Sequence, residues 1–330
     1  MGEKRINTTR IAPMVETGCH SYHRRAFAHN YFAPFIYHII LKKQRHCEAF
    51  GTVAGDARIE YGKPGCAYIK ESQLGMAVAK AIVHSGYEYP ILKLHQYCVM
   101  PDHAHILLEV QEWSDQHLDF YIEKIKETAA KKYSLSGNRI YTKEEIFEAG
   151  YCDKPLLRDI SLSGWYKYIR LNPHRLALRM QYPQFFQRVH KLKIDEKELE
   201  AYGNLSMLRN PDKMAVKISS KYTEEERVAK ENQWLENAAR GSVLISPFIS
   251  TAEKQIREEA EKLGAPIILI KHEAFPERYR PSAHDFELCA QGKLLILSLG
   301  KEEKRNLTRG MCMEMNALAA KIAKGGVRVW

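Results

Sequence analysis

The sequence lacks long hydrophobic runs and paired cysteines. No apolar stretch approaches the ~20 residues that a membrane-spanning helix needs, so we expect no membrane segment. The seven cysteines are an odd number and form no Cys-x-x-Cys pair, which argues for reduced thiols rather than a disulfide framework or a zinc ribbon. The residues after Met1 form no apolar signal segment. Together these absences predict a cytoplasmic protein.

The usual nucleotide-binding signatures are also missing. The chain contains neither a Gly-x-Gly-x-x-Gly nor a Walker A sequence, so we expect no dinucleotide or ATP chemistry. The chain has 330 residues, which is long enough for two ordinary domains, and a net charge of +10. Excess positive charge suits a polyanionic partner such as DNA, although many proteins of similar charge bind none.

A His-x-His pair lies in a predicted hairpin. Residues 91–100 are rich in strand formers, Pro101 interrupts them, and a second strand is expected from His103 to Val110. Because side chains alternate across a sheet, His103 and His105 share one face, and the opposite face is uniformly apolar. The two imidazoles could hold one cation. The alternative is that one caps the strand and the other hydrogen-bonds a neighbour.

A Tyr-x-x-x-Asn pair follows in a predicted helix over residues 162–169. Asn172 precedes a proline, which favours a helix end there. Tyr168 and Asn172 are four residues apart, so we expect them on one helix face, where both could approach one phosphate. Tyr166 is the rival nucleophile, but it points about 160° away and has no amide one turn later. Alternatively, Tyr168 is only a half-buried amphipathic residue.

The elements around these pairs predict an α+β fold. A strand is expected at residues 35–41, with helices at 71–85 and 118–133. The order strand, helix, hairpin, helix predicts an antiparallel sheet with helices on one face. The histidines would then lie on the uncovered face.

The second half alternates short apolar runs with helical segments. Residues from about 186 to 240 are polar and charged and contain turn signals. The alternating strand and helix segments are expected at Met214–Ile218, Glu224–Ala239, Val243–Ser246, Ala252–Leu263, Pro266–Ile270, Ala283–Ala290 and Leu294–Leu299, with a final helix near Lys304–Lys324. This spacing predicts an α/β domain with a parallel, doubly wound sheet. The Ser246–Ser250 loop opens a helix whose first turn could hold phosphate, but ordinary N-capping is the alternative that we favour.

Three ordered blocks resemble the single-tyrosine HUH transposases, and most closely the REP-associated tyrosine transposases. The family's signatures are a hydrophobic run with Met-Pro-Asn-His-x-His-Leu-Leu, a Gly-aromatic-x-Asp-x-x-Leu-Arg segment, and Tyr-Ile-x-x-Asn-Pro-x-Arg. The similarity covers roughly residues 30–185. It departs at Asp102, where Asn is commoner, and at residues 48–65, which are hard to align. The matching blocks are Tyr97–Leu108, Gly150–Arg158 and Tyr168–Arg175.

The resemblance implies a fold, a reaction and a set of site residues. Residues 1–190 would form a ferredoxin-like HUH domain. His103 and His105 would bind Mg²⁺ or Mn²⁺, with Asn172 as a third ligand. Tyr168 would attack the scissile phosphate and form a 5′-phosphotyrosine. The DNA backbone would be held by Lys167, Arg170, His174 and Arg175.

Residues 191–330 loosely resemble the nucleotide-binding-like domain of the DNA-processing protein A family. The matching segments are Gly203–Leu208, Ser246–Ser250 and Cys289–Leu295. They imply a Rossmann-like accessory module that binds DNA or a partner.

Three functions stay open at this point. The first is a transposase-type nickase and strand transferase acting on single-stranded or hairpin DNA. The second is a domesticated hairpin-binding protein that does not cut. The third is a small-ligand sensor that uses the second domain. A homodimer is allowed, and so is either a cis or a trans active site.

Overall fold

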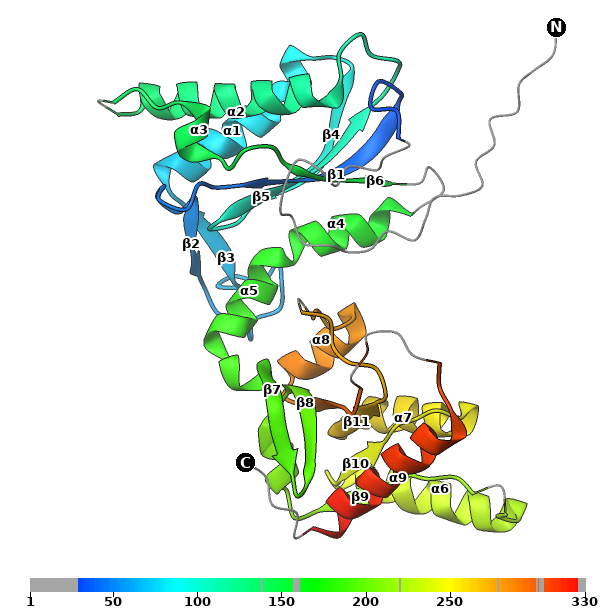
Figure 1. The fold of residues 1–330 in the computed structure, drawn as a ribbon. Coiled ribbons are helices and arrows are strands. Elements are labelled where there is room, and N and C mark those ends of the chain that lie inside the picture. The colour runs from blue at the N-terminus through cyan, green and yellow to red at the C-terminus, as the bar shows by residue number, and fades with distance from the viewer. Residues whose placement is uncertain are drawn as a thin grey trace, which may run out of the picture. The chain divides into compact units, whose positions relative to one another are not determined.

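The chain divides into two compact units, residues up to 177 and residues from 178. The expected domain boundary at 190/191 lies inside strand β7 (Gln187–Ile194), which belongs to the sheet of the second unit. Leu157 and Arg158 of the second sequence block lie outside the described residues. The computed structural model (Figure 1) describes residues 29–137, 139–156, 161–219, 221–277, 279–300, 302 and 306–325.

The first unit is built on a four-stranded antiparallel sheet, which was the expected kind of sheet. Its order is β4-β5-β1-β6, and a separate hairpin pairs β2 with β3. The predicted strands at 35–41 and 91–110 are confirmed, whereas β6 and the β2–β3 hairpin were not anticipated. The strands are β1 (Phe35–Lys42), β2 (Gly51–Ala54), β3 (Tyr68–Glu71), β4 (Leu92–Val99), β5 (His103–Val110) and β6 (Cys152–Leu156).

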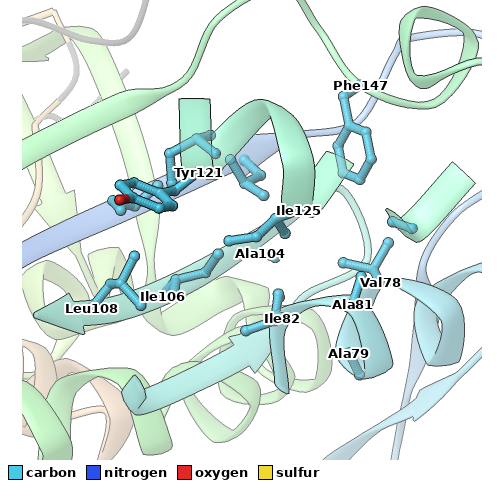
Figure 2. Close-up of a cluster of buried hydrophobic side chains, with 14 of the residues drawn as sticks. Val78, Ala79, Ala81, Ile82, Ala104, Ile106, Leu108, Tyr121, Ile125 and Phe147 are labelled. Atoms are coloured by element: carbon cyan, nitrogen blue, oxygen red, sulfur yellow. The ribbon is translucent and has the colours of Figure 1, made fainter. Parts of the chain in front are cut away.

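Two long helices cover one face of this sheet. These are α1 (Gln73–Glu88) and α2 (Leu118–Leu135), and both were predicted; the short α3 (Lys143–Ile146) follows α2. Figure 2 shows β5 side chains pointing into the core between the sheet and these helices. The alternation is the predicted one, because the buried β5 positions on this face are Ala104, Ile106, Leu108 and Val110.

The opposite face, which carries the histidines, is not bare. Helix α4 (Leu162–Arg170) lies on it (Figure 1), and Leu107, Leu156 and Ile169 are buried between helix and sheet. The expectation of helices on one face only is therefore wrong. The cause lies in the composition of α4, whose apolar stripe needs a partner surface, and the face of β5 that carries Leu107 supplies it.

Helix α4 and the next helix are separate elements. α4 ends at Arg170, and α5 (Asn172–Gln181) begins two residues later, with Pro173 in its first turn where a proline is tolerated. The predicted helix end at Asn172 is confirmed to within two residues. However, Tyr168 and Asn172 lie in different helices, so the expectation that they share one helix face is wrong.

Strand β4 contains a bulge. Leu94 pairs with Leu108 and Gln96 pairs with Leu107, so His95 is an extra residue on the β4 side of the ladder. Such a bulge changes where the following side chains point. Before it, Leu92 faces the core with α1 and α2; after it, Val99 does.

The second unit has a six-stranded mixed sheet of order β7-β8-β12-β11-β10-β9. Strands β9 to β12 are parallel as predicted, but β8 is antiparallel to β12 and β7 to β8. The expectation of a wholly parallel sheet is thus wrong at one edge. The further strands are β8 (Lys197–Gly203), β9 (Lys213–Ala215), β10 (Val243–Ser246), β11 (Ile267–Lys271) and β12 (Leu294–Ser298).

Helices cover both faces of this second sheet. Side chains of α6, α7 and α8 share one buried cluster with the strands, and side chains of α9 share another. The helices are α6 (Glu224–Ala239), α7 (Thr251–Lys262), α8 (Ala283–Ala290) and α9 (Arg309–Lys324). Each of them lies within a few residues of a segment that was predicted to be helical.

The structure also bears on the two expectations that we drew from the lack of long apolar runs and of paired cysteines. Within the described residues, no helix combines the length and apolarity needed to cross a bilayer. Free thiols are found at Cys47, Cys66, Cys98, Cys289 and Cys312, whereas Cys152 is disulfide-bonded. The prediction of reduced thiols therefore holds for five of the seven cysteines and fails for Cys152, and Cys19 lies outside the described residues.

Candidate functional site

The His-x-His pair lies at the start of β5, and its two rings meet. Nε2 of His103 is 3.0 Å from Nε2 of His105, and the ring centroids are 4.6 Å apart. His105 is almost completely buried, at 3% exposure, while His103 is half-buried. The predicted common face of the two imidazoles is therefore confirmed.

Each imidazole of the pair has a further partner on its other nitrogen. Nδ1 of His103 lies 2.6 Å from Oδ1 of Asp102, and this hydrogen bond lowers the pKa of the Asp102 carboxyl. Because a carboxylate only accepts, His103 donates from Nδ1. Nδ1 of His105 lies 2.9 Å from Nε2 of His38 on β1. The four side chains thus form one chain from Asp102 to His38.

His38 is a member of the site that we did not predict from the sequence. Its ring stacks on His105 with centroids 5.1 Å apart, and it is 7% exposed. Burial, with smaller contributions from Lys154 and His103, lowers the pKa of His38 to about 4, so the ring is neutral and its unprotonated nitrogen can accept a hydrogen bond. A signal was present: strand alternation puts His38 on the face opposite Tyr37 and Ile39, which are core residues.

The facing nitrogens of His103 and His105 define what this pair can hold. Two imidazole nitrogens 3.0 Å apart need a proton or a cation between them, since two lone pairs repel. If His105 donates to His38, both Nε2 lone pairs face each other. Two ligands about 2.1 Å from one octahedral ion lie about 3.0 Å apart, so the observed spacing fits adjacent positions on such an ion. Among the described residues, no three His, Cys, Asp and Glu side chains are placed to hold one metal ion.

Tyr168 is brought next to this histidine cluster. Its ring centroid lies 5.7 Å from that of His105 and 5.9 Å from that of His38, both in edge-to-face orientation. The Arg175 guanidinium lies 5.7 Å from the centroid of the Tyr168 ring, within the range of a cation–π contact. Within the described part of the chain, no hydrogen-bond partner is found for the Tyr168 hydroxyl.

The other predicted site residues are placed less decisively. None of the hydrogen bonds between described residues joins Asn172 to the histidine pair, and its buried Nδ2 has no hydrogen-bond partner. Nδ1 of His174 is likewise buried and without one. Lys167 and Arg170 are exposed on α4, and the Arg170 guanidinium lies 5.4 Å from the ring of Tyr61.

Tyr166 has partners that the sequence reasoning missed. Its hydroxyl lies 2.9 Å from Nδ1 of His95, and Nε2 of His95 lies 2.7 Å from Oε2 of Glu109. No sequence periodicity points to this contact, because His95 is the bulged residue of β4.

The Ser246–Ser250 loop of the second unit is an N-cap, as favoured from the sequence. The Ser250 hydroxyl accepts from the backbone N–H of Glu253, and the Glu253 carboxylate accepts from the N–H groups of Ser250, Ile249 and Ile218. A 5% exposed carboxylate thus occupies the first turn of α7, where a phosphate would need the same donors.

Comparison with known proteins gives little similarity. No family model matches the chain, and no curated protein has a similar sequence. Among solved structures, a REP-associated tyrosine transposase bound to a REP hairpin is similar over 47% of this chain and 73% of its own chain. The sequence identity is 14% and the TM-score is 0.31, and a likeness this weak carries no argument about function.

Proposed function

We propose that this protein is a metal-dependent, single-strand DNA endonuclease and strand transferase with a tyrosine nucleophile. The observation that carries the proposal is the convergence of His103 and His105 beside Tyr168. Their Nε2 atoms lie 3.0 Å apart, and their other nitrogens are bonded to Asp102 and His38. Metal-binding histidines commonly have such partners on their second nitrogen. The sequence resemblance to single-tyrosine HUH transposases points the same way.

In this proposal His103 and His105 hold Mn²⁺ or Mg²⁺, and Asn172 is a third ligand. The bound ion would supply Lewis-acid polarisation of a phosphate oxygen. The Tyr168 hydroxyl attacks the phosphorus, the bond to the 3′-oxygen breaks, and a 5′-phosphotyrosine and a 3′-hydroxyl result. Arg175 beside the Tyr168 ring holds the phosphate. Lys167, Arg170 and His174 contact the DNA backbone nearby.

The finer fold assignment belongs to the same proposal. We infer that the first unit is a ferredoxin-like HUH domain and the second a Rossmann-like accessory module, with the division after Ala177 rather than at residue 190. The substrate is single-stranded or hairpin DNA, and the reaction takes place in the cytoplasm, where a homodimer is allowed. In the single chain, Tyr168 lies against its own histidines, which supports an active site formed in cis.

A covalent-adduct assay tests the proposal. The purified protein is mixed with labelled hairpin oligonucleotides from its own genomic flanks and Mn²⁺, and the products are separated on a denaturing gel. We expect a shifted band that is lost in Tyr168→Phe and His103→Ala. The control is Tyr87→Phe, whose side chain is 80% exposed on α1. Binding without any adduct in the wild type would refute cleavage and favour the alternative, a domesticated hairpin-binding protein.

A further inference from the structure

A second hydrogen-bonded group lies on the other side of α4 from the histidine pair. The Tyr166 hydroxyl is 2.9 Å from Nδ1 of His95, and Nε2 of His95 is 2.7 Å from Oε2 of Glu109. Lys93 lies 3.6 Å from the same carboxylate oxygen. The His95 side chain is 8% exposed, so the middle of this chain of hydrogen bonds is shielded from water.

The direction of each bond follows from the chemistry of the groups. The Glu109 carboxylate only accepts, so His95 donates from Nε2. The remaining Nδ1 lone pair of His95 accepts from the Tyr166 hydroxyl. Every group thus has one defined role, and a phenylalanine at position 166 would leave Nδ1 of His95 without a donor.

The position of α4 depends on contacts such as these. α4 has nine residues, and helices this short have little stability of their own in water. Apolar contacts with Leu107 and Leu156 hold the helix against the sheet. Because such contacts are not directional, they do little to fix the rotation of the helix about its own axis. A directional bond at Tyr166 fixes that rotation. Tyr168 is two residues further on, about 160° away around the helix, and it lies on the flank that faces His38 and His105.

The β4 bulge makes this contact available. The regular ladder continues from the pair Leu94–Leu108 to the pair Gln96–Leu107, and His95 is the added residue between them. Bulges of this kind re-aim a side chain next to a functional site. Here the extra residue is the one that bonds to both α4 and β5.

We propose that Tyr166, His95 and Glu109 form a positioning network that sets α4 on the sheet and thereby holds Tyr168 at the histidine pair. The inference rests on the proposed function. Among the described residues, no hydrogen bond of Tyr166, His95 or Glu109 goes to the histidine pair or to Tyr168, so the effect of the network on the reaction passes through the placement of Tyr168. Misplacement of a reacting group by about 1 Å can lower a rate about 100-fold.

The test compares reaction rate, DNA affinity and helix mobility in the full chain. Tyr166→Phe is expected to slow adduct formation 10- to 100-fold at saturating DNA and Mn²⁺. The Kd for DNA should stay within twofold, and amide exchange in the peptide covering α4 should become faster. Glu109→Gln should have a smaller effect, because an acceptor for His95 is retained. The double variant should be no slower than Tyr166→Phe alone, since both act through one chain of bonds. The matched control is Ser163→Ala, an exposed change on the same helix.

Different results would overturn the two proposals separately. Unchanged rate and unchanged α4 exchange in Tyr166→Phe would refute the positioning network, and so would an adduct mapped to Tyr166 itself. Additive losses in the double variant would refute it as well. Absence of adduct in the wild type would refute the proposed function. In that case, faster α4 exchange in Tyr166→Phe would still support the network, and unchanged exchange would refute it too.

Discussion

His38 links the predicted metal pair to the neighbouring strand β1. Its Nε2 lies 2.9 Å from Nδ1 of His105, and the two rings stack. Without His38, the His105 ring could adopt its other tautomer and could rotate. Both changes act on the nitrogen that faces His103.

His38→Ala is therefore expected to weaken Mn²⁺ binding about 10- to 100-fold, the usual cost of losing a partner behind a metal-binding histidine. Isothermal titration calorimetry with Mn²⁺ measures this directly. His84→Ala, a half-exposed histidine on α1, is the control and should bind as the wild type does. An equal affinity in His38→Ala and wild type would contradict the role assigned to His38.

The low pKa of His38 also predicts a pH effect on stability. In the folded chain His38 stays neutral down to about pH 4, whereas the unfolded chain protonates it near pH 6.5. The unfolded state therefore binds the extra proton between these values, and stability falls as pH falls from 6.5 to 4. At pH 4.5 the loss from this one group is about 2–3 kcal/mol. Urea unfolding of wild type and His38→Gln, without divalent metal, should show a shallower pH dependence in the variant. Parallel curves for the two proteins would contradict this.

At the scale of single residues, sequence reasoning found part of the site. Alternation along β5 was enough to place His103 and His105 together, because strand geometry is local. His38 and His95 could not be found in the same way. His38 meets His105 only through pairing of β1 with β5, and His95 is placed by a bulge that interrupts the alternation.

At the scale of elements, the start of helix α1 lies unusually close to the backbone of Phe50. A Cβ at Gly75 would lie 1.8 Å from the carbonyl oxygen of Phe50. Backbone atoms cannot rotate away as a side chain can, so the helix itself would have to shift. Gly164 in α4 is different, because a Cβ there would meet no atom within 4 Å.

These two glycines give opposite predictions for the same substitution. Alanine is favoured over glycine inside a helix by about 1 kcal/mol, so Gly164→Ala should stabilise α4 by about 0.5–1 kcal/mol. In Gly75→Ala the overlap with Phe50 outweighs this gain, and we expect a net loss of about 1–3 kcal/mol. Free energies of unfolding from urea titrations decide the matter. A stabilised Gly75→Ala would mean that α1 moves more easily than its packing indicates.

Elements marked by apolar runs, helical periodicity or capping residues were predictable, and charged edge strands were not. α6, β10 and α8 lie where the sequence indicated, because apolar periodicity and capping residues mark them. The β7–β8 hairpin was missed because its strands are rich in charged residues. The buried apolar residues Leu192, Ile194, Leu199 and Ala201 alternate with these charged side chains. The placement of α4 depends on a tertiary surface that no local pattern describes.

For the whole molecule, the proposed function and the net charge of +10 together predict DNA binding that depends strongly on salt. A plot of log Kd against log salt concentration should be linear. Arg170→Ala and Lys167→Ala should each reduce its slope by about one, if each side chain contacts one phosphate. Lys124→Ala, on helix α2 across the sheet from α4, should leave the slope unchanged. An unaltered slope in all three variants would show that α4 lies outside the DNA interface.

The bulge at His95 also has a consequence for how this protein can vary in evolution. Without that one residue, β4 would read as an uninterrupted strand in which Leu92, Leu94, Tyr97 and Val99 still face the same core. Gain or loss of a single codon would therefore add or remove the contact to Tyr166 and leave the hydrophobic face of the hairpin in register. In related sequences, we expect a one-residue gap here to accompany the replacement of Tyr166.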